Sequence, residues 1–417
     1  MARICISLGS HLCQSPRGVR EASALAAAGH DVLLLGPIFS EQHAAEDQDL
    51  IRSVAWRYRP TLDLRPMQST RVERFIMRGT RRVGMAVVKY TGIQLADSLG
   101  YGIRKNLRLV ESLPWDLHIG HHEIGCWVSF ILARKGMRVG ADFEDWCSRD
   151  LAPEAQRKRP LRLLRQCEDY LLHHAAHLST TSHVMAAATQ RAYGGQLPEV
   201  VYNVFQWSDR NSIDNLTLDR VDKNKPSLYW VSKVIGAGRG LELLFDALRS
   251  VQTPVEVHLR GAHGEKIAAG LHSKFPASHG HRLFLHGPLP AKQLLSRISE
   301  HDIGLALELS QPASRDLTIT LKFFHYLLGG LAVLATNTSG QAEIARSIPD
   351  AVVLANQESS HDLASKIIEL VGNRQRLSAA KAAARAAAKA RFCWEQQAPI
   401  LVNSVERALL RNVKFVK

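Results

Sequence analysis

Residues 227–248 read SLYWVSKVIGAGRGLELLFDAL, a strand-like run, a glycine-rich turn and a helical run in direct succession. SLYWVSKV has the apolar and β-branched content of a buried strand, and LELLFDAL has apolar residues at helical spacing. Gly236, Gly238 and Gly240 fall in the turn between them. This order is typical of a strand–helix unit in a parallel sheet, so the stretch predicts an α/β fold.

The same alternation continues on both sides of this stretch. Strand-like runs follow it at VEVHLRGA, RLFLHG, IGLALEL and AVVLANQ, and precede it at ARICISLG, DVLLLG, DLHIGH and MRVGADF. A polar segment, SDRNSIDNLTLDRVDKNKP, separates the two series. We therefore expect two Rossmann-like domains with parallel sheets facing a central cleft, with ligands at the carboxyl ends of the strands. The expected bounds are 1–205 for the first domain, 206–226 for a linker, 227–390 for the second domain and 391–417 for a helix returning to the first.

Charge and cysteine content narrow the classes of function. The chain has 53 Lys and Arg against 39 Asp and Glu, a net charge of +14, which favours anionic partners. No zinc-finger spacing, aromatic RNA-binding cluster or basic tail supports nucleic acid, so phosphorylated ligands or an anionic membrane surface are expected. The six cysteines are scattered, and no signal peptide or bilayer-length apolar run appears, which favours the cytoplasm.

The glycine-rich turn suits a diphosphate. Small residues allow phosphate oxygens to approach the backbone, and the following helix favours negative charge at its start. Lys233 and Arg239 add two cations on either side of the turn. A dinucleotide-binding turn is the competing interpretation, but its third glycine would fall on Leu241, and the acid expected further along would be Glu256 within a strand-like run.

Residues 71–90, RVERFIMRGTRRVGMAVVKY, predict a basic amphipathic helix. Such a helix can lie on an anionic bilayer. The alternative is a solvated helix whose apolar face packs on its own domain.

The second half of the chain resembles the retaining glycosyltransferases of family four, which have the GT-B fold. In that family a strand and a short basic loop hold the donor diphosphate, and the matching positions are Ser232, Lys233, Arg239 and Gly240. The segment LTITLKFFHYLLGGLAVLATN resembles the family's donor-binding helix, and Lys322 keeps its lysine. The family's two glutamates are replaced by Leu317 and His325, so Glu308 or Asp316 is expected to compensate.

The first half matches the family at fewer positions. SPRGVREAS resembles its first strand–helix turn at Arg17 and Gly18. His121 matches a histidine that faces the donor sugar, with His122 as the alternative if the match is shifted by one residue. Three acids in GADFEDW complete the expected acceptor side: Asp142, Glu144 and Asp145. Because adjacent residues of an extended chain point to opposite faces, Glu144 and Asp145 are not expected to serve one site together.

The resemblance implies transfer of a sugar from a nucleoside diphosphate sugar, with retention, to a glycan or lipid-linked acceptor in polysaccharide or glycoconjugate synthesis. It implies no bound metal or other cofactor, with Lys233 and Arg239 neutralising the leaving diphosphate and His121 contacting the sugar. The expected location is the cytoplasm, as a peripheral protein on the inner membrane face. A non-catalytic GT-B protein that binds a glycan or partner, and an NAD-dependent oxidoreductase, remain as alternatives.

Overall fold

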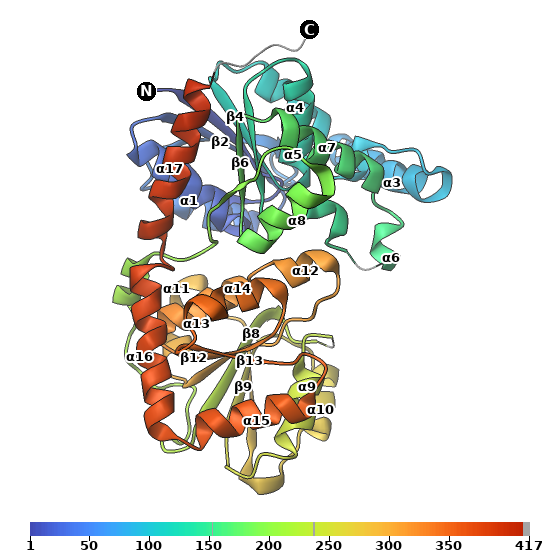
Figure 1. Cartoon of the computed structure of the whole chain (residues 1–417). Coiled ribbons are helices and arrows are strands. Elements are labelled where there is room, and N and C mark those ends of the chain that lie inside the picture. Colours follow the sequence, from blue (N-terminus) through green and yellow to red (C-terminus); the bar gives the residue numbers. More distant parts are fainter. Residues whose placement is uncertain (152, 237, 412–417) are drawn as a thin grey trace. The chain divides into compact units, whose positions relative to one another are not determined.

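The computed structural model describes residues 1–151, 153–236 and 238–411 (Figure 1). The chain divides into two compact units. Unit 1 contains Met1–Val201 and the segment from Ala398 onward, and unit 2 contains Tyr202–Gln397. Each unit is built on one sheet in which every pairing is parallel. The predicted α/β class with two Rossmann-like domains is confirmed.

The seven strands of unit 1 follow the order β3-β2-β1-β4-β5-β6-β7. The direction of the order reverses between β1 and β4, and the carboxyl ends of strands at such a point are where ligands bind in open α/β sheets. The strands are β1 (Arg3–Ser7), β2 (Asp31–Ile38), β3 (Arg57–Asp63), β4 (Leu117–His121), β5 (Val139–Phe143), β6 (His177–Thr180) and β7 (Glu199–Val200).

Helices cover both faces of this sheet. The apolar residues of α5 and α7 form one core with the central strands, while α1 packs against β2. The central strands β4 and β5 are buried at every position, as expected of parallel strands covered on both faces. The helices are α1 (Pro16–Ala27), α2 (Glu41–Ile51), α3 (Arg71–Thr91), α4 (Ile103–Glu111), α5 (His122–Arg134), α6 (Pro153–Gln156), α7 (Leu161–His174) and α8 (His183–Tyr193).

Unit 2 repeats this plan with six strands in the order β10-β9-β8-β11-β12-β13, and its order reverses between β8 and β11. The strands are β8 (Ser227–Val234), β9 (Glu256–Ala262), β10 (Arg282–His286), β11 (Ile303–Ala306), β12 (Ala332–Thr336) and β13 (Val352–Ala355). The helices are α9 (Leu241–Leu248), α10 (Glu265–Lys274), α11 (Ala291–Ser299), α12 (Ala313–Leu317), α13 (Leu321–Gly329), α14 (Ser339–Ser347), α15 (Ser360–Val371), α16 (Arg374–Ala390) and α17 (Trp394–Leu410).

The core of unit 2 comes from α9 and α15, which pack together against the sheet. On the other face α13 packs against α11 and α16. Helix α17 begins in unit 2, and its part from Ala398 onward belongs to unit 1, where His177 Nδ1 lies 3.0 Å from Ser404 Oγ and Arg407 pairs with Glu199 at 2.6 Å.

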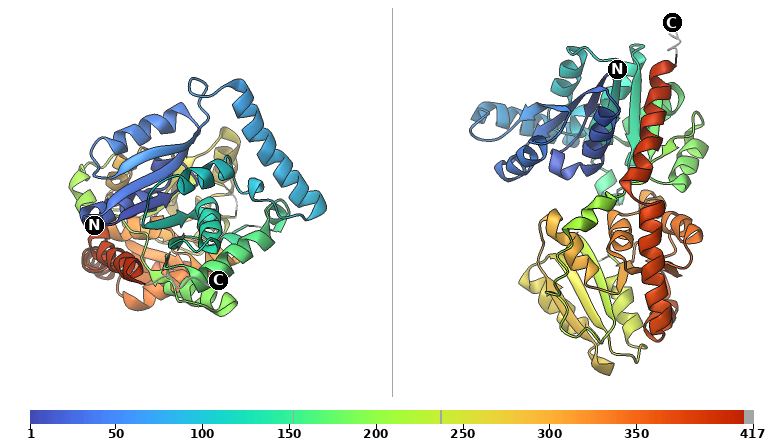
Figure 2. Two further views of the ribbon diagram at one scale, coloured as in Figure 1. Left: turned by 90° about the horizontal axis from the view of Figure 1, so that it is seen from above. Right: turned by 90° about the vertical axis from the view of Figure 1, so that its left-hand side faces the viewer.

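Helix α3 confirms the helix predicted over residues 71–90, and only part of its apolar surface packs on unit 1. Gly84 and Val88 are its only buried residues among those described. Phe75 and Tyr90 are 78% and 76% exposed. Figure 1 and the left view of Figure 2 show α3 projecting from the sheet of unit 1. Part of the apolar surface of α3, around Gly84 and Val88, therefore packs on unit 1 as the second interpretation expects, and part is exposed.

No helix within the described residues is both long and apolar enough to cross a bilayer.

Candidate functional site

The turn after β8 brings together the residues predicted to bind a diphosphate. Ser232 and Lys233 lie in the last part of β8, and Arg239 lies at the other side of the turn. Arg239 Nη1 donates to Ser232 Oγ at 3.0 Å, so the two ends of the turn are joined. Both cations are exposed to solvent. This turn leaves the sheet of unit 2 where its strand order reverses.

Gly240 holds the turn against the neighbouring strand. It is the N-cap of α9 with φ at +78°, a conformation that residues with a Cβ rarely adopt. A Cβ at this position would lie 2.5 Å from both Cβ and the carbonyl oxygen of Leu307. A glycine is therefore required for the turn to approach the chain that leaves β11.

Glu308 and Lys322 form an ion pair beside the turn. Lys322 Nζ lies 2.5 Å from Glu308 Oε1 and 5.1 Å from the centre of the Trp230 ring. Burial raises the pKa of Glu308, but the charge of Lys322, with smaller contributions from Arg315 and Arg239, outweighs this and lowers its pKa overall. Glu308 is thus an ionised carboxylate within the field of several cations, and one of them is Arg239.

The other predicted donor-side residues have different surroundings. Asp316 is the acceptor for Ser310 Oγ at 2.9 Å and for Ser339 Oγ at 2.6 Å, so both of its carboxylate oxygens already have partners. Asp316 therefore holds the start of α14, and Glu308 is the better candidate of the two for a ligand contact. His325 lies one turn after Lys322 on α13, where its ring stacks on Phe205 with centroids 3.5 Å apart.

In unit 1, three of the predicted acceptor-side residues, Arg17, Gly18 and Asp142, form a buried layer together with His121. Arg17 is a bidentate donor to Asp142, with Nη2 at 2.7 Å from Oδ2, and its Nη1 donates to the carbonyl oxygen of Val201 at 2.6 Å. Burial raises the pKa of Asp142, but Arg17 and then His121 outweigh this and bring it to about 2. A Cβ at Gly18 would lie 2.5 Å from Leu8 Cδ2, so the glycine lets α1 approach β1 closely.

His121 belongs to the same buried layer. Its Nε2 lies 2.5 Å from Glu21 Oε2, and both side chains are buried. Burial lowers the pKa of His121, but the Glu21 carboxylate outweighs it and raises the pKa overall. The ring is paired through Nε2 only, and its Nδ1 has no hydrogen-bond partner among the described residues, so the contact of His121 with a donor sugar stays a prediction.

His122, the alternative one residue on, lines a cavity of about 270 Å³ at the carboxyl ends of β1 and β4. It has φ at +56°, uncommon for a residue with a Cβ and the kind of local strain that gathers at functional sites. Its Nε2 lies 3.4 Å from Glu144 Oε2. Burial raises the pKa of Glu144, but the contact with His122 outweighs it and lowers the pKa.

Glu144 and Asp145 line this cavity together. The expectation that they cannot serve one site is wrong, because β5 ends at Phe143 and the chain bends at both residues instead of continuing extended. Sequence reasoning missed the remaining polar lining residues, which are Ser10, Glu123 and Asp150. Ser10 lies in the short segment after β1, which ends at Ser7, and a position shortly beyond a strand end was the signal that would have found it.

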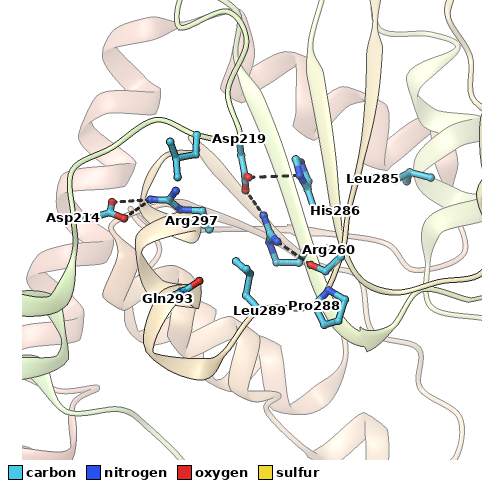
Figure 3. A pocket seen from close by; sticks show the side chains of 11 residues that line it. Asp214, Asp219, Arg260, Leu285, His286, Pro288, Leu289, Gln293 and Arg297 are labelled. Carbon is cyan, nitrogen blue, oxygen red and sulfur yellow. Dashed lines mark hydrogen bonds and ion pairs between the residues drawn. The ribbon is translucent and has the colours of Figure 1, made fainter.

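A larger cavity of about 680 Å³ lies in unit 2 near the ends of β9 and β10, and no predicted site residue lines it (Figure 3). Its charged groups already pair with one another. Asp219 contacts Arg260 and lies 3.5 Å from His286 Nδ1, and Asp214 lies 2.6 Å from Arg297 Nη2. These pairs fasten the segment before β8 to β9 and β10 and to helix α11.

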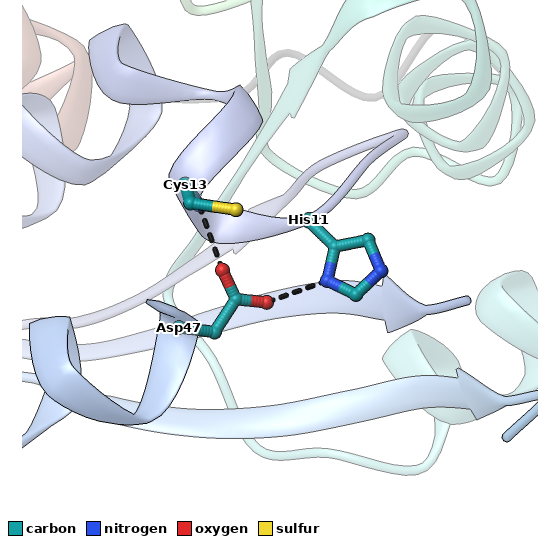
Figure 4. A group of neighbouring side chains, drawn as sticks. All are labelled: His11, Cys13 and Asp47. Atoms are coloured by element: carbon teal, nitrogen blue, oxygen red, sulfur yellow. Dashed lines mark hydrogen bonds and ion pairs between the residues drawn. The ribbon is translucent and has the colours of Figure 1, made fainter. Parts of the chain in front are cut away.

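Two side-chain groups in unit 1 have the spacing of metal ligands. One is Glu21, His121 and Asp142, the buried layer described above, and the other is His11, Cys13 and Asp47 (Figure 4). His11 Nε2 is the acceptor for the Phe39 backbone N–H at 2.8 Å, so its proton lies on Nδ1, which contacts Asp47 Oδ2 at 2.7 Å. This hydrogen bonding leaves no lone pair on Nδ1 for a metal and fits a structural cluster.

The comparisons with known proteins identify the fold. No family model and no curated protein sequence match the chain. Sucrose-phosphate synthase from Thermosynechococcus elongatus superposes with a TM-score of 0.67 and 14% identity, covering 97% of this chain and 98% of that one. Anabaena HepE in complex with UDP and glucose gives a TM-score of 0.65 and 16% identity, covering 97% and 100%.

A variant of S. aureus TarM, in complex with Fondaparinux, alpha-GlcNAc-glycerol and UDP, gives a TM-score of 0.64 and 9% identity, covering 99% of this chain and 100% of that one. All three alignments run through both units, which have one parallel Rossmann-like sheet each. The chain therefore has the GT-B fold.

Proposed function

We propose that the protein is a glycosyltransferase that moves a sugar from a nucleoside diphosphate sugar to an acceptor hydroxyl. The observation that carries the proposal is the turn after β8, where Lys233 and Arg239 flank a glycine-rich backbone at the reversal point of the unit 2 sheet. The GT-B fold supports it, since HepE and TarM were crystallised with UDP. Phosphate oxygens are the ligand that such a turn fits best.

The chemistry of the donor side is electrostatic in this proposal. Negative charge builds on the diphosphate as the sugar leaves, and Lys233 and Arg239 stabilise that charge more in the transition state than in the bound donor. Lys322 adds a third cation, and Glu308 accepts hydrogen bonds from donor hydroxyls. We propose that transfer needs no metal ion, because these cations neutralise the leaving group, and that it proceeds with retention, as the resemblance to the retaining family implies.

Unit 1 holds the acceptor in this proposal. The cavity beside His122 offers the carboxylates of Glu144, Asp145 and Asp150, which suit the hydroxyl groups of a sugar. His122 is the histidine that contacts substrate in this proposal, and His121, in the buried layer next to it, holds the chain at this point in place. The acceptor is a glycan or lipid-linked sugar of a polysaccharide or glycoconjugate pathway. The six cysteines are free thiols, which suits the proposed cytoplasmic location.

The observations do not favour an NAD-dependent oxidoreductase. Glu256, the acid expected to bind the ribose, is the first residue of β9 and thus lies at the amino end of its strand. It is buried, and its Oε2 lies 3.4 Å from His258 Nε2. A ribose beside the turn after β8 would be at the opposite edge of the sheet.

A transfer assay tests the proposal. The protein is incubated with UDP- and GDP-linked sugars and with glycan acceptors, in excess EDTA, and the anomeric configuration of the product is read by NMR. We expect transfer in EDTA, with the configuration of the donor kept. Rescue only by magnesium or manganese would contradict the metal-free mechanism, and nucleotide binding without any turnover would favour the non-catalytic alternative.

A further inference from the structure

Helix α3 carries an apolar stripe that the rest of unit 1 leaves uncovered. Its exposed apolar side chains are Val72, Phe75, Ile76, Val83 and Tyr90. At 3.6 residues per turn these positions fall within a sector of about 100°. The helix has 21 residues and is therefore about 31 Å long. Single exposed apolar residues are ordinary, but a continuous stripe of this length is not.

The stripe faces away from the domain. Gly84 and Val88, the buried positions of α3, lie on the opposite side of the helix. A Cβ at Gly84 would lie 3.0 Å from the backbone nitrogen of Ser98, so the helix backbone rests on the short helix Ala96–Ser98 at this point. The contact therefore fixes which face of α3 points outward.

A basic flank runs beside the stripe. Arg71, Arg78, Arg82 and Lys89 fall on one side of it, and none has an ion pair within the described part of the chain. Arg74 and Arg81 are used internally, as a donor to the Ser69 carbonyl oxygen and over the Tyr101 ring. The single acid of α3, Glu73, already pairs with Lys105 at 3.2 Å. The outward surface of α3 thus joins apolar side chains to uncompensated positive charge.

We propose that α3 is a docking surface for an anionic lipid bilayer. The apolar stripe would enter the boundary between headgroups and acyl chains, with Tyr90 at the level of the headgroups and the basic flank on anionic lipid phosphates. The six basic residues of α3 rule out a bilayer-crossing orientation. A second copy of the chain is a poorer occupant, because its α3 would bring the same positive charge and no available acid.

Vesicle flotation with the full chain tests this proposal without any sugar transfer, so its outcome does not depend on the proposed function. Phosphatidylcholine vesicles are compared with vesicles that contain about 30 mol% phosphatidylglycerol. We expect flotation with the anionic vesicles alone and its loss at high salt, which screens the basic flank. Equal binding to both kinds of vesicle, or to neither, would overturn the proposal.

Matched variants locate the surface. Arg78→Glu with Arg82→Glu should weaken binding to anionic vesicles by about 30-fold or more, at roughly fivefold for each charge. Lys266→Glu with Lys274→Glu changes net charge equally on the exposed helix α10 and should bind like the wild type. Phe75→Ser with Ile76→Ser should also lose binding, whereas Ile267→Ser on α10 should keep it.

All these substitutions are at exposed positions, so circular dichroism and thermal unfolding should not change. The proposal fails if the α3 and α10 variants bind alike. It also fails if light scattering shows a wild-type dimer that Phe75→Ser with Ile76→Ser converts to a monomer while vesicles bind neither protein. That result would assign α3 to a contact between copies of the chain.

Discussion

Arg239 is the side chain through which the proposed donor site acts most directly. It is exposed, anchored to Ser232 Oγ at 3.0 Å, and close enough to Glu308 to lower the pKa of that carboxyl. An anchored guanidinium loses less freedom when it binds a phosphate than a free one does.

Arg239→Ala should weaken binding of a nucleoside diphosphate by about 1.5–3 kcal/mol, the range for charge-assisted hydrogen bonds. Binding of the nucleoside alone should change far less. Calorimetry measures both, with Arg249→Ala as the control, since that exposed arginine lies beyond the far end of α9. Equal losses for nucleotide and nucleoside would remove Arg239 from the diphosphate site.

Variants of His325 distinguish two roles for this residue on α13, a ribose contact and a packing residue. As a ribose contact its neutral ring accepts one hydroxyl, so His325→Ala should weaken nucleotide binding by about 1 kcal/mol and His325→Glu should preserve it. As a packing residue it stabilises the fold, for example by stacking on Phe205. In that case His325→Ala and Phe205→Ala should both lower the melting temperature and leave nucleotide affinity unchanged. Affinity and melting curves of the three variants decide between the two.

At the scale of elements, the turn between β8 and α9 depends on one glycine. Gly240→Ala places a Cβ 2.5 Å from Leu307 and at a positive φ, and the strain from φ alone costs about 1–2 kcal/mol. We expect a loss of at least about 2 kcal/mol in the free energy of unfolding, together with weaker nucleotide binding. Gly236→Ala, where a Cβ meets nothing within 4 Å, should change stability by less than about 0.5 kcal/mol. Urea unfolding of the two variants gives the comparison, and similar losses would contradict it.

The Arg17–Asp142 pair ties α1 to β5 and to the backbone at Val201. The folded-state pKa of Asp142, about 2, lies below its usual value of 3.8, so the stabilisation from the pair is complete above about pH 4 and is lost as pH falls toward 2. That contribution is about 2 kcal/mol. Asp142→Asn should lower stability by about 3–5 kcal/mol near neutral pH, because Arg17 stays buried without its partner.

In Asp142→Asn the free energy of unfolding should fall less steeply between about pH 4 and about pH 2 than in the wild type, because the titration of Asp142 is absent. Urea unfolding between about pH 5 and about pH 2 measures this slope. Asp49→Asn, in the exposed pair with Arg52, is the control and should follow the wild type. A wild-type slope in Asp142→Asn would show that the pair does not titrate on unfolding.

Element types were predictable because apolar periodicity and the glycine-rich turn are local signals. The strands at ARICISLG and SLYWVSKV and the helix over residues 71–90 are examples. Burial was less predictable, since it depends on distant segments. His121 and His122 are adjacent, yet only the second reaches a cavity, because α1 brings Glu21 over the first. The bend after Phe143, which turns Glu144 and Asp145 to one side, also has no marker in the sequence.

At the scale of the whole molecule, each unit has its candidate site at the point where strand order reverses. In unit 2 the turn after β8 and Glu308 after β11 meet there, and in unit 1 Ser10 after β1 and His122 after β4 do. The +14 charge of the chain favours anionic ligands in general, so it supports a phosphate-bearing substrate and an anionic bilayer equally. The net charge does not distinguish the two roles. The residues at the turn after β8 indicate phosphate binding, and those on α3 indicate bilayer binding.

Calorimetric titration of the purified chain with UDP, GDP and NAD in excess EDTA tests the proposed function most directly. The turn after β8 predicts binding of a nucleoside diphosphate without metal, and its loss in Arg239→Ala but not in Arg249→Ala. NAD should not bind, because Leu241 replaces the third glycine of a dinucleotide turn and Glu256 lies at the wrong strand end. Binding of NAD, or failure of both nucleoside diphosphates to bind, would contradict the assignment of a nucleotide-sugar site to this turn.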